Sequence, residues 1–199
     1  GLWRPYSQAE LMKVMMAVLP DVAEYCRVSR MIRDFSSDDI VVGNKTTNFR
    51  QLVEAKAKNI KEIRYREIKN TSVRPEDLRL KITTYNTSIG TEKFLQWVTK
   101  DNQIAGFLRL ALPRESAPTP ELQGAVLIRE LHVYGQALTL GGAGKTQHSG
   151  LGKQLLLKAK ALAAGYNQLS VISSIGTRQY YRRQGFKDGE LYQHLKLVD

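Results

Sequence analysis

A short run of glycines at the start of a helical pattern is the feature that most constrains how this chain folds. Residues 147–152 read Gln-His-Ser-Gly-Leu-Gly, and residues 151–164 continue with apolar side chains at helical spacing. Gly150 and Gly152 let the backbone approach a ligand closely, and the unpaired N–H groups of a first helical turn attract anions. The run predicts a site for a phosphate-bearing cofactor. An ordinary glycine-rich helix start is an equally good interpretation of the run alone.

The segments around this run predict a strand before it and a helix after it. Side chains alternate over residues 125–135, and strict alternation sorts them into two faces: Val126, Ile128, Glu130, His132 and Tyr134 against Leu127, Arg129, Leu131 and Val133. Gly165 is expected to end the helix. A buried strand at 169–173, a helix from about Thr177 to a stop at Gly185, and a last strand at 191–198 complete this part.

The rest of the chain favours hairpins in its middle and helices near its start. Alternating segments at 80–85, 94–99 and 104–112 predict a three-stranded meander, followed by a proline-rich surface loop at 113–124. Helices are predicted at 7–19, after a Ser7 cap, and at 49–60, with a strand at 27–32. Residues 70–77 read as a linker.

Several motifs together carry a resemblance to a known family. The order of strand, Gln-x-x-Gly-x-Gly, helix, strand and then Tyr-x-x-x-Gly-Phe at residues 181–186 resembles the GNAT acetyltransferases, whose glycine turn binds the diphosphate of acetyl-CoA. More specifically, residues 129–135, Gln147 with His148, and residues 171–183 are similar to the acetyltransferase half of the Elongator catalytic subunit, the tRNA wobble-uridine acetyltransferase. Residues 27–34 and 64–67 resemble the segments that lead into that half from its radical-SAM half. The similarity is weakest at 35–55 and 76–124.

The resemblance implies an α+β fold in two parts. Residues 76–199 are expected to form the GNAT-type acetyl-CoA-binding domain, a mostly antiparallel sheet flanked by helices and splayed near the cofactor. Residues 1–75 are expected to be a small α/β remnant of the radical-SAM half with a linker. The methionines of this remnant are then expected to be exposed former core: Met12, Met15, Met16 and Met31.

The cysteine count limits the cofactors that the resemblance implies. The radical-SAM half of the family carries an iron–sulfur motif of three cysteines, whereas this chain has one, Cys26. The iron–sulfur cluster and S-adenosylmethionine are therefore expected only in a missing half, and the chain is expected to be a C-terminal fragment. Many relatives have a cysteine implicated in a zinc site where Ile60 stands here. No structural zinc is predicted, and no other metal site.

The charge balance indicates a polyanionic partner. The formal net charge is +11 and the isoelectric point is near 9.8. With the resemblance this implies tRNA, and the candidate contacts are Arg27, Arg30, Arg33, Arg64 and Arg66. A basic surface that merely keeps the chain soluble is the alternative. The sequence shows no membrane span or signal peptide, so a cytoplasmic protein is expected. The resemblance leaves open other Elongator subunits or a homo-oligomer as partners.

The resemblance also implies roles for individual residues. In GNAT enzymes a Glu on the strand before the glycine turn often serves as base, and a Tyr on the last helix protonates the leaving thiolate. Glu130 and Tyr181 match these positions, and Tyr180 is expected to help hold the acetyl group. Glu130 is equally well interpreted as a structural carboxylate paired with Arg129 or Arg178. The expected contacts to acetyl-CoA are Leu131, His132, Val133, Gln147, His148, Ser149, Gly150, Leu151, Gly152, Lys153 and Tyr180.

Two points about these roles stay open. His132 and His148 are more readily interpreted as hydrogen-bonded structural histidines than as catalytic groups. The glycine-containing loop at 135–146 is either a cover for the thioester or an ordinary connector.

The expected function is that of the acetyl-CoA-binding acetyltransferase part of an Elongator-type tRNA-modifying enzyme. The resemblance implies that the intact protein hydrolyses acetyl-CoA when tRNA docks, and that this chain alone is incomplete for the full reaction. A stand-alone GNAT enzyme that acetylates a protein or a small amine is one alternative. A non-catalytic RNA-binding module that keeps acetyl-CoA as a structural ligand is another.

Overall fold

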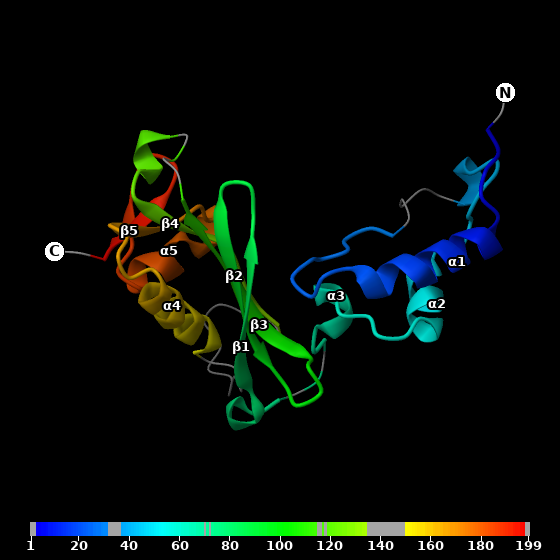
Figure 1. Cartoon of the computed structure of the whole chain (residues 1–199), viewed down its shortest axis with the longest axis horizontal. Coiled ribbons are helices and arrows are strands. Elements are labelled where there is room, and N and C mark those ends of the chain that lie inside the picture. The colour runs from blue at the N-terminus through cyan, green and yellow to red at the C-terminus, as the bar shows by residue number, and fades with distance from the viewer. Residues whose placement is uncertain are drawn as a thin grey trace. The chain divides into compact units, whose positions relative to one another are not determined.

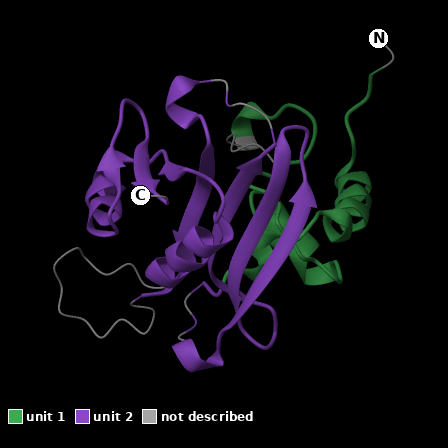
Figure 2. Ribbon diagram, turned by 60° about the vertical axis from the view of Figure 1, so that its left-hand side comes forward, with its two compact units in different colours: residues 1–67 green, residues 68–199 purple. Residues whose placement is uncertain are grey.

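The chain forms two compact units in the computed structural model, which describes residues 3–31, 37–69, 71, 73–114, 117, 119–134 and 150–197. Unit 1 comprises residues 1–67 and unit 2 residues 68–199 (Figure 2). Figure 1 shows that helices make up unit 1, whereas unit 2 is built on a sheet. None of the described helices is long and apolar enough to cross a membrane. Each unit is described below by itself.

Unit 1 is helical and has a small core of its own. Its elements are α1 (Gln8–Val18), α2 (Phe49–Lys56) and α3 (Ile63–Arg66), with 3-10 turns at Leu19–Asp21 and Ser37–Asp39. Ser7 caps α1 through a reciprocal capping box with Glu10, so the predicted cap is confirmed. The core comprises Leu19, Phe49, Val53 and Ile60. Met12, Met15, Met16 and Met31 are partly buried against this core, so the prediction that they would be exposed is wrong.

The predicted strand at 27–32 is absent from the described residues 27–31 of unit 1. The Val28 N–H donates to Glu62 Oε2 at 3.0 Å, and the Val28 carbonyl accepts from Arg50 Nη1 at 2.6 Å. The Ser29 carbonyl accepts from Arg64 Nη1 at 2.7 Å. Side chains thus satisfy backbone groups that a neighbouring strand would otherwise pair, so this segment needs no strand partner.

Unit 2 is built on a seven-stranded sheet in the order β1-β2-β3-β4-β5-β7-β6. The strands are β1 (Arg79–Asn86), β2 (Gly90–Val98), β3 (Ile104–Pro113), β4 (Ala125–Val133), β5 (Gln168–Val171), β6 (Lys187–Asp188) and β7 (Gln193–Lys196). Every pairing is antiparallel except that of β4 with β5. Short 3-10 turns lie at Pro75–Asp77 and Pro120–Leu122. The α+β class and the mostly antiparallel sheet are confirmed, as is the three-stranded meander β1–β3.

Two helices complete the described part of unit 2. The first, α4 (Leu151–Leu162), contacts β2, β3 and β4. Its buried side chains Leu155, Leu156 and Ala159 share one apolar core with side chains of these strands. Gly165 follows it with a φ of +93°, a conformation that favours glycine, as predicted for the helix end. The second helix, α5 (Ile175–Arg183), is followed by Gly185 with a φ of +91°.

Strand β4 contains a bulge that strict alternation does not predict. Its register against β3 shifts between two neighbouring residues, because Arg109 pairs with Glu130 whereas Leu110 pairs with Ile128. Arg129 is therefore an extra residue on β4 with no partner of its own in the ladder.

The bulge exchanges the faces of the strand beyond it. Ile128, before the bulge, is buried in the core that α4 covers, and Leu131, after it, packs against the same core. Glu130 and His132 pair with residues on the opposite face of β3. The predicted grouping of Glu130 and His132 with Ile128 is therefore wrong, because one inserted residue inverts the alternation.

Candidate active site

The end of β4 separates from β5, which leaves one backbone edge open. The two strands pair in parallel only from Ala125 with Gln168 to Ile128 with Val171, where β5 ends. β4 continues to Val133. Among the described residues, no strand pairs with this edge of 129–133. Backbone N–H and C=O groups on a free edge bind extended ligands through strand-like hydrogen bonds. This opening agrees with the splay that the family resemblance implied.

A pocket of about 520 Å³ lies beside this opening. The end of β4, the start of α4 and one face of α5 line this pocket. Its lining residues are Leu131, Val133, Gly150, Gly152, Lys153, Thr177, Tyr180 and Tyr181. Two other predicted contacts point elsewhere, because the Leu151 side chain is buried in a small core and His132 lies on the opposite face of β4. Gln147, His148, Ser149 and the loop at 135–146 lie outside the described residues.

The first turn of α4 presents backbone donors to the pocket. Gly150 occupies the N-cap position with a φ of +107°, and no side chain of the described residues caps the helix. The N–H groups of the first turn therefore keep their capacity to bind an acceptor. The positive end of the helix dipole favours an anion at the same place.

Gly152 and Tyr180 meet inside the pocket. A Cβ built on Gly152 would lie 2.8 Å from the Tyr180 hydroxyl oxygen and 3.6 Å from Val133 Cγ2, so a larger residue would force a shift. The Tyr180 hydroxyl is buried and has no hydrogen-bond partner among the described residues. Burying a hydroxyl without a hydrogen-bond partner costs free energy. Such a hydroxyl in a pocket is therefore a candidate to form a hydrogen bond with a ligand. Burial raises the pKa of Tyr180 above its usual value.

Tyr181 is held more tightly than its neighbour. It is 6% exposed, and its ring packs edge-on against Tyr180 at 5.3 Å and against Phe186 at 5.4 Å. Burial, with a smaller contribution from Tyr180, raises the pKa of Tyr181 to about 12. Both tyrosines are therefore protonated at neutral pH and able to donate a hydrogen bond or a proton.

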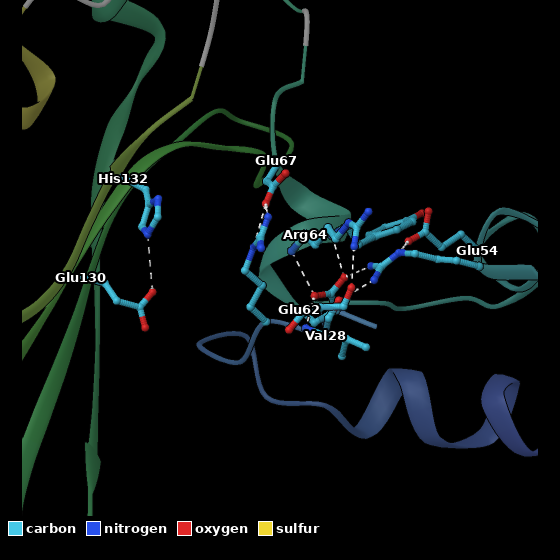
Figure 3. A network of polar contacts seen from close by, with 11 residues as sticks. Val28, Glu54, Glu62, Arg64, Glu67, Glu130 and His132 are labelled. Atoms are coloured by element: carbon cyan, nitrogen blue, oxygen red, sulfur yellow. Dashed lines mark hydrogen bonds and ion pairs between the residues drawn. The ribbon is translucent and has the colours of Figure 1, made fainter. Parts of the chain in front are cut away.

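Glu130 forms an ion pair, but with a different arginine from those predicted. Arg109 Nε donates to Glu130 Oε1 at 3.3 Å across the β3–β4 ladder. The other carboxylate oxygen, Oε2, lies 3.9 Å from His132 Nε2 (Figure 3). Arg129 pairs instead with Glu92. The ion pair thus favours the interpretation of Glu130 as a structural carboxylate, but its partner is Arg109 and not Arg129.

The ion pair of Glu130 belongs to a larger polar network on this face. Glu92, with 5% of its side chain exposed, accepts from Arg129 Nη1 at 2.5 Å and from the Tyr85 hydroxyl at 2.6 Å. The Tyr85 hydroxyl also accepts from Arg109. Burial, and next the hydrogen bond to Glu92, raise the pKa of Tyr85 to about 12. Arg109 therefore connects two carboxylate-containing clusters, and its guanidinium lies 5.4 Å from the centre of the Phe94 ring.

The candidate RNA-binding arginines differ in how they are held. Arg30 is exposed, and Arg27 forms an ion pair with Glu67 at 2.9 Å while 44% of its side chain stays exposed. Arg64 is exposed and donates to the Ser29 carbonyl. Arg66 is only 6% exposed, and its guanidinium donates to backbone carbonyls of 61 and 24, so it acts in the packing of unit 1. Arg33 lies outside the described residues.

A buried carboxylate organises the segment that bears these arginines. Glu62 is fully buried and accepts from Arg50 and from the N–H groups of Val28, Arg64 and Tyr65 (Figure 3). Charged hydrogen bonds of this kind fix the backbone that they join. Among the described residues, no three His, Cys, Asp or Glu side chains gather in a way that suits a metal ion.

Sequence reasoning missed Arg109 and Thr177. Thr177 lines the pocket from the first turns of α5, and nothing in its local sequence distinguishes it. Arg109 had a usable signal, because it is the single charged residue of a ten-residue apolar strand. A charge inside such a strand is expected to have a partner on a neighbouring strand.

The chain is similar to several known proteins. No family model matches it. It is 35% identical over 214 aligned positions to the tRNA uridine(34) acetyltransferase of Dehalococcoides mccartyi, which covers 98% of this chain and 46% of that protein. It is 33% identical over 202 positions to the Elongator complex protein 3 of Homo sapiens, which covers 94% of this chain and 37% of that protein.

A solved structure agrees with these relatives. The archaeal Elp3 of Methanocaldococcus infernus with an N-terminal deletion matches with a TM-score of 0.82 at 30% identity, over 96% of this chain and 49% of that one. The chain therefore spans less than half the length of these relatives. Over nearly its whole length, the chain is a homologue of Elongator complex protein 3 and of the tRNA uridine(34) acetyltransferases.

Proposed function

We propose that this chain is the acetyl-CoA-binding acetyltransferase part of an enzyme that modifies the wobble uridine of tRNA. The observation that carries the proposal is the pocket at the end of β4, where the glycine turn of α4 meets two tyrosines of α5. Homology to proteins named tRNA uridine(34) acetyltransferase supports the same reaction for the longer protein. The intact enzyme, on this proposal, hydrolyses acetyl-CoA when tRNA docks.

The pocket fits acetyl-CoA through its backbone groups. The uncapped first turn of α4, with residues 148 and 149 before it, would hold the pyrophosphate on N–H groups of 148–153. The open edge of β4 at 129–133 would receive the amides of the pantetheine arm. Acetyl-CoA supplies an activated acetyl group and a thiolate leaving group.

The two tyrosines would act at the thioester. Tyr181 orients or protonates the sulfur, and Tyr180 helps to hold the acetyl group. The unpartnered hydroxyl of Tyr180 supports a ligand contact at that residue. Since burial keeps both side chains protonated, each can donate to the developing thiolate or to the acetyl oxygen.

Glu130 would act on the acceptor side of the reaction. Its carboxylate lies on the face of β4 opposite the pocket residues Leu131 and Val133. A base that deprotonates an acceptor has to lie on the side from which the acceptor approaches, so Glu130 remains the candidate base. Its ion pair with Arg109 would fix the position of the carboxylate for either role.

A tRNA surface would lie on unit 1. Arg27, Arg30 and Arg64 are exposed residues. Arg33 is proposed with them from the sequence pattern alone. Phosphate contacts of this kind supply affinity without base recognition. Arg66 is left out of this surface because it is buried against backbone carbonyls.

The remaining parts of the reaction would be carried by further segments of a longer protein to which this chain would belong. Residues 1–75 would be the end of its radical-SAM half, which would hold the iron–sulfur cluster and S-adenosylmethionine. Other Elongator subunits or a second copy would be its partners, in the cytoplasm. The chain spans 46% of the Dehalococcoides relative, which is consistent with activity that needs residues beyond it.

Acetyl-CoA hydrolysis, measured with and without tRNA, tests this function. The full-length protein is expected to release CoA only when tRNA is present, and this chain is expected to bind acetyl-CoA. Release of CoA that depends on an added amine, and not on RNA, would support a stand-alone acetyltransferase instead. Tight tRNA binding with no cleavage under either condition would indicate a non-catalytic RNA-binding module.

A further inference from the structure

The polar face at the end of β4 bears two side chains that do not line the acetyl-CoA pocket. Glu130 and His132 extend from the same face of the strand, as Figure 3 shows. The pocket residues Leu131 and Val133 alternate with them on the other face. A group bound by Glu130 and His132 would therefore lie across the strand from the pocket.

His132 presents a flat ring that packs against a buried aromatic ring. Its ring is 5.0 Å from the Phe107 ring, at an interplanar angle of 30°, and Phe107 is fully buried. The ring of Tyr134 lies 6.4 Å away at 15°. The His132 side chain is nevertheless 55% exposed. An aromatic ring that packs on a buried ring while more than half of its side chain stays exposed can stack on a nucleobase.

Glu130 places an acceptor next to this platform. Arg109 holds one carboxylate oxygen, Oε1, so the side chain has a fixed position. The second oxygen, Oε2, is 3.9 Å from His132 Nε2, which is too long for a hydrogen bond, and no described residue donates to it. This oxygen can accept from the edge of a base that stacks on His132, because residues two apart on a strand share a face.

The chemistry of the site selects among the bases. A carboxylate accepts from the ring N3–H of uracil or the ring N1–H of guanine, whereas the N3 of cytosine and the N1 of adenine carry no hydrogen, so these two bases can donate only from an exocyclic amino group at another position on the base edge. We infer that Glu130 and His132 form a nucleobase site that recognises the wobble uracil, with His132 stacking on the base and Glu130 accepting from its N3–H. The choice of uracil over guanine rests on the proposed function.

The test compares two anticodon stem-loop RNAs that differ only in uracil or cytosine at the wobble position. Their dissociation constants for the full-length protein are measured by fluorescence anisotropy at one fixed ionic strength, because phosphate contacts depend on salt. We expect the uracil RNA to bind about tenfold more tightly, since cytosine has no hydrogen on N3 and has to shift its stacked position before its amino group can reach Glu130. Glu130→Gln is expected to bring the ratio close to one, because an amide both accepts and donates.

The stacking contact is tested separately from the carboxylate. His132→Ala is expected to weaken both RNAs by about tenfold while keeping their ratio, and His132→Phe is expected to restore the lost affinity, because stacking needs only a flat ring. Glu190→Gln, at an exposed carboxylate of unit 2, is the matched control and should change neither constant.

The outcomes separate this inference from the proposed function. Binding of both RNAs with equal affinity by the unsubstituted protein would overturn the inference and leave the proposed function intact. A base preference that persists in Glu130→Gln would also overturn it, as would full affinity in His132→Ala. Failure of the unsubstituted protein to bind either RNA, together with no effect of tRNA on acetyl-CoA hydrolysis, would overturn the proposed function as well.

Discussion

The two faces of β4 at residues 129–133 differ sharply although they share one backbone. One face contributes Leu131 and Val133 to a pocket that contains two protonated tyrosines and an uncapped helix start. The other face bears Glu130 and His132 beside a network of arginines and carboxylates. A single inserted residue, Arg129, is what turns the polar side chains away from the pocket.

On the proposed function, this difference lets one strand separate two tasks. An apolar wall suits the thioester of acetyl-CoA, because it places no charged side chain beside the reacting sulfur. The positive end of a helix dipole suits the phosphates of CoA. Fixed charges suit recognition of an acceptor, because hydrogen bonds to charged groups discriminate strongly between donors and acceptors. A bulge beside an active site re-aims side chains in this way at little cost to the sheet.

The largest effect is expected on the pocket face, from Tyr181→Phe. The substitution removes one hydroxyl and keeps the ring that packs on Phe186. If the hydroxyl is the general acid, tRNA-dependent acetyl-CoA hydrolysis by the full-length protein should fall by a factor on the order of 10² to 10⁴ with nearly unchanged cofactor affinity. Steady-state rates and calorimetric titration check both quantities.

Tyr180→Phe is the natural companion to this substitution. Unchanged rates in Tyr181→Phe with slow rates in Tyr180→Phe would move the acid role to the residue whose hydroxyl is unpartnered. A pH profile adds a further check. Because the pKa of Tyr181 is about 12, its ionisation should not reduce the rate until the pH approaches that value, and the loss should come on the alkaline side.

Gly152→Asp is expected to have the second-largest effect. Its side chain would begin 2.8 Å from the Tyr180 hydroxyl and would add a negative charge where the pyrophosphate is proposed to bind. Acetyl-CoA affinity should fall by about 100-fold or more, because both the space and the anion site are lost. Gly176→Ala is the control, since a Cβ there meets no atom within 4 Å. Unchanged affinity in a folded Gly152→Asp protein would remove the anion site from this turn.

Arg109→Met tests the polar face. The Arg109 side chain is 11% exposed and joins Glu92 with Glu130, so its removal leaves the buried Glu92 carboxylate, and the partly exposed Glu130, with less compensation. We expect the free energy of unfolding to fall by about 3 kcal/mol in urea titrations. Acetyl-CoA affinity should fall less than in Gly152→Asp, because the pocket lies on the other face. Arg183→Met, at an exposed arginine, is the control, and an equal loss of stability there would contradict a special role for Arg109.

The smallest effect is expected in unit 1, from Arg30→Ala. If the exposed Arg30 contacts a phosphate, tRNA affinity should fall a few-fold at low salt, and the slope of log affinity against log salt should become shallower by about one unit. Lys187→Ala removes the same charge from an exposed position in unit 2 and serves as control. Identical slopes for both variants and the unsubstituted protein would leave β4 as the better candidate for the RNA contact.

Local patterns in the sequence predicted most of the elements. The Ser7 cap, the helix after Gly150 and the stops at Gly165 and Gly185 depend on backbone conformations that neighbouring residues set. The three meander strands followed from alternation and turns. The strand predicted at 27–32 failed because Glu62, distant in sequence, satisfies its backbone. Propensity is a weak guide where such tertiary contacts supply the hydrogen bonds.

The sequence by itself determined the order of the elements, the glycine turn, the pair of tyrosines and the resemblance to a family. Only the tertiary structure decided that Glu130 faces away from the pocket, that Arg109 is its partner, and that Arg66 is buried. The physical reason is that turns and helix ends depend on neighbours along the chain, whereas strand register, a bulge and burial depend on residues brought together from far apart.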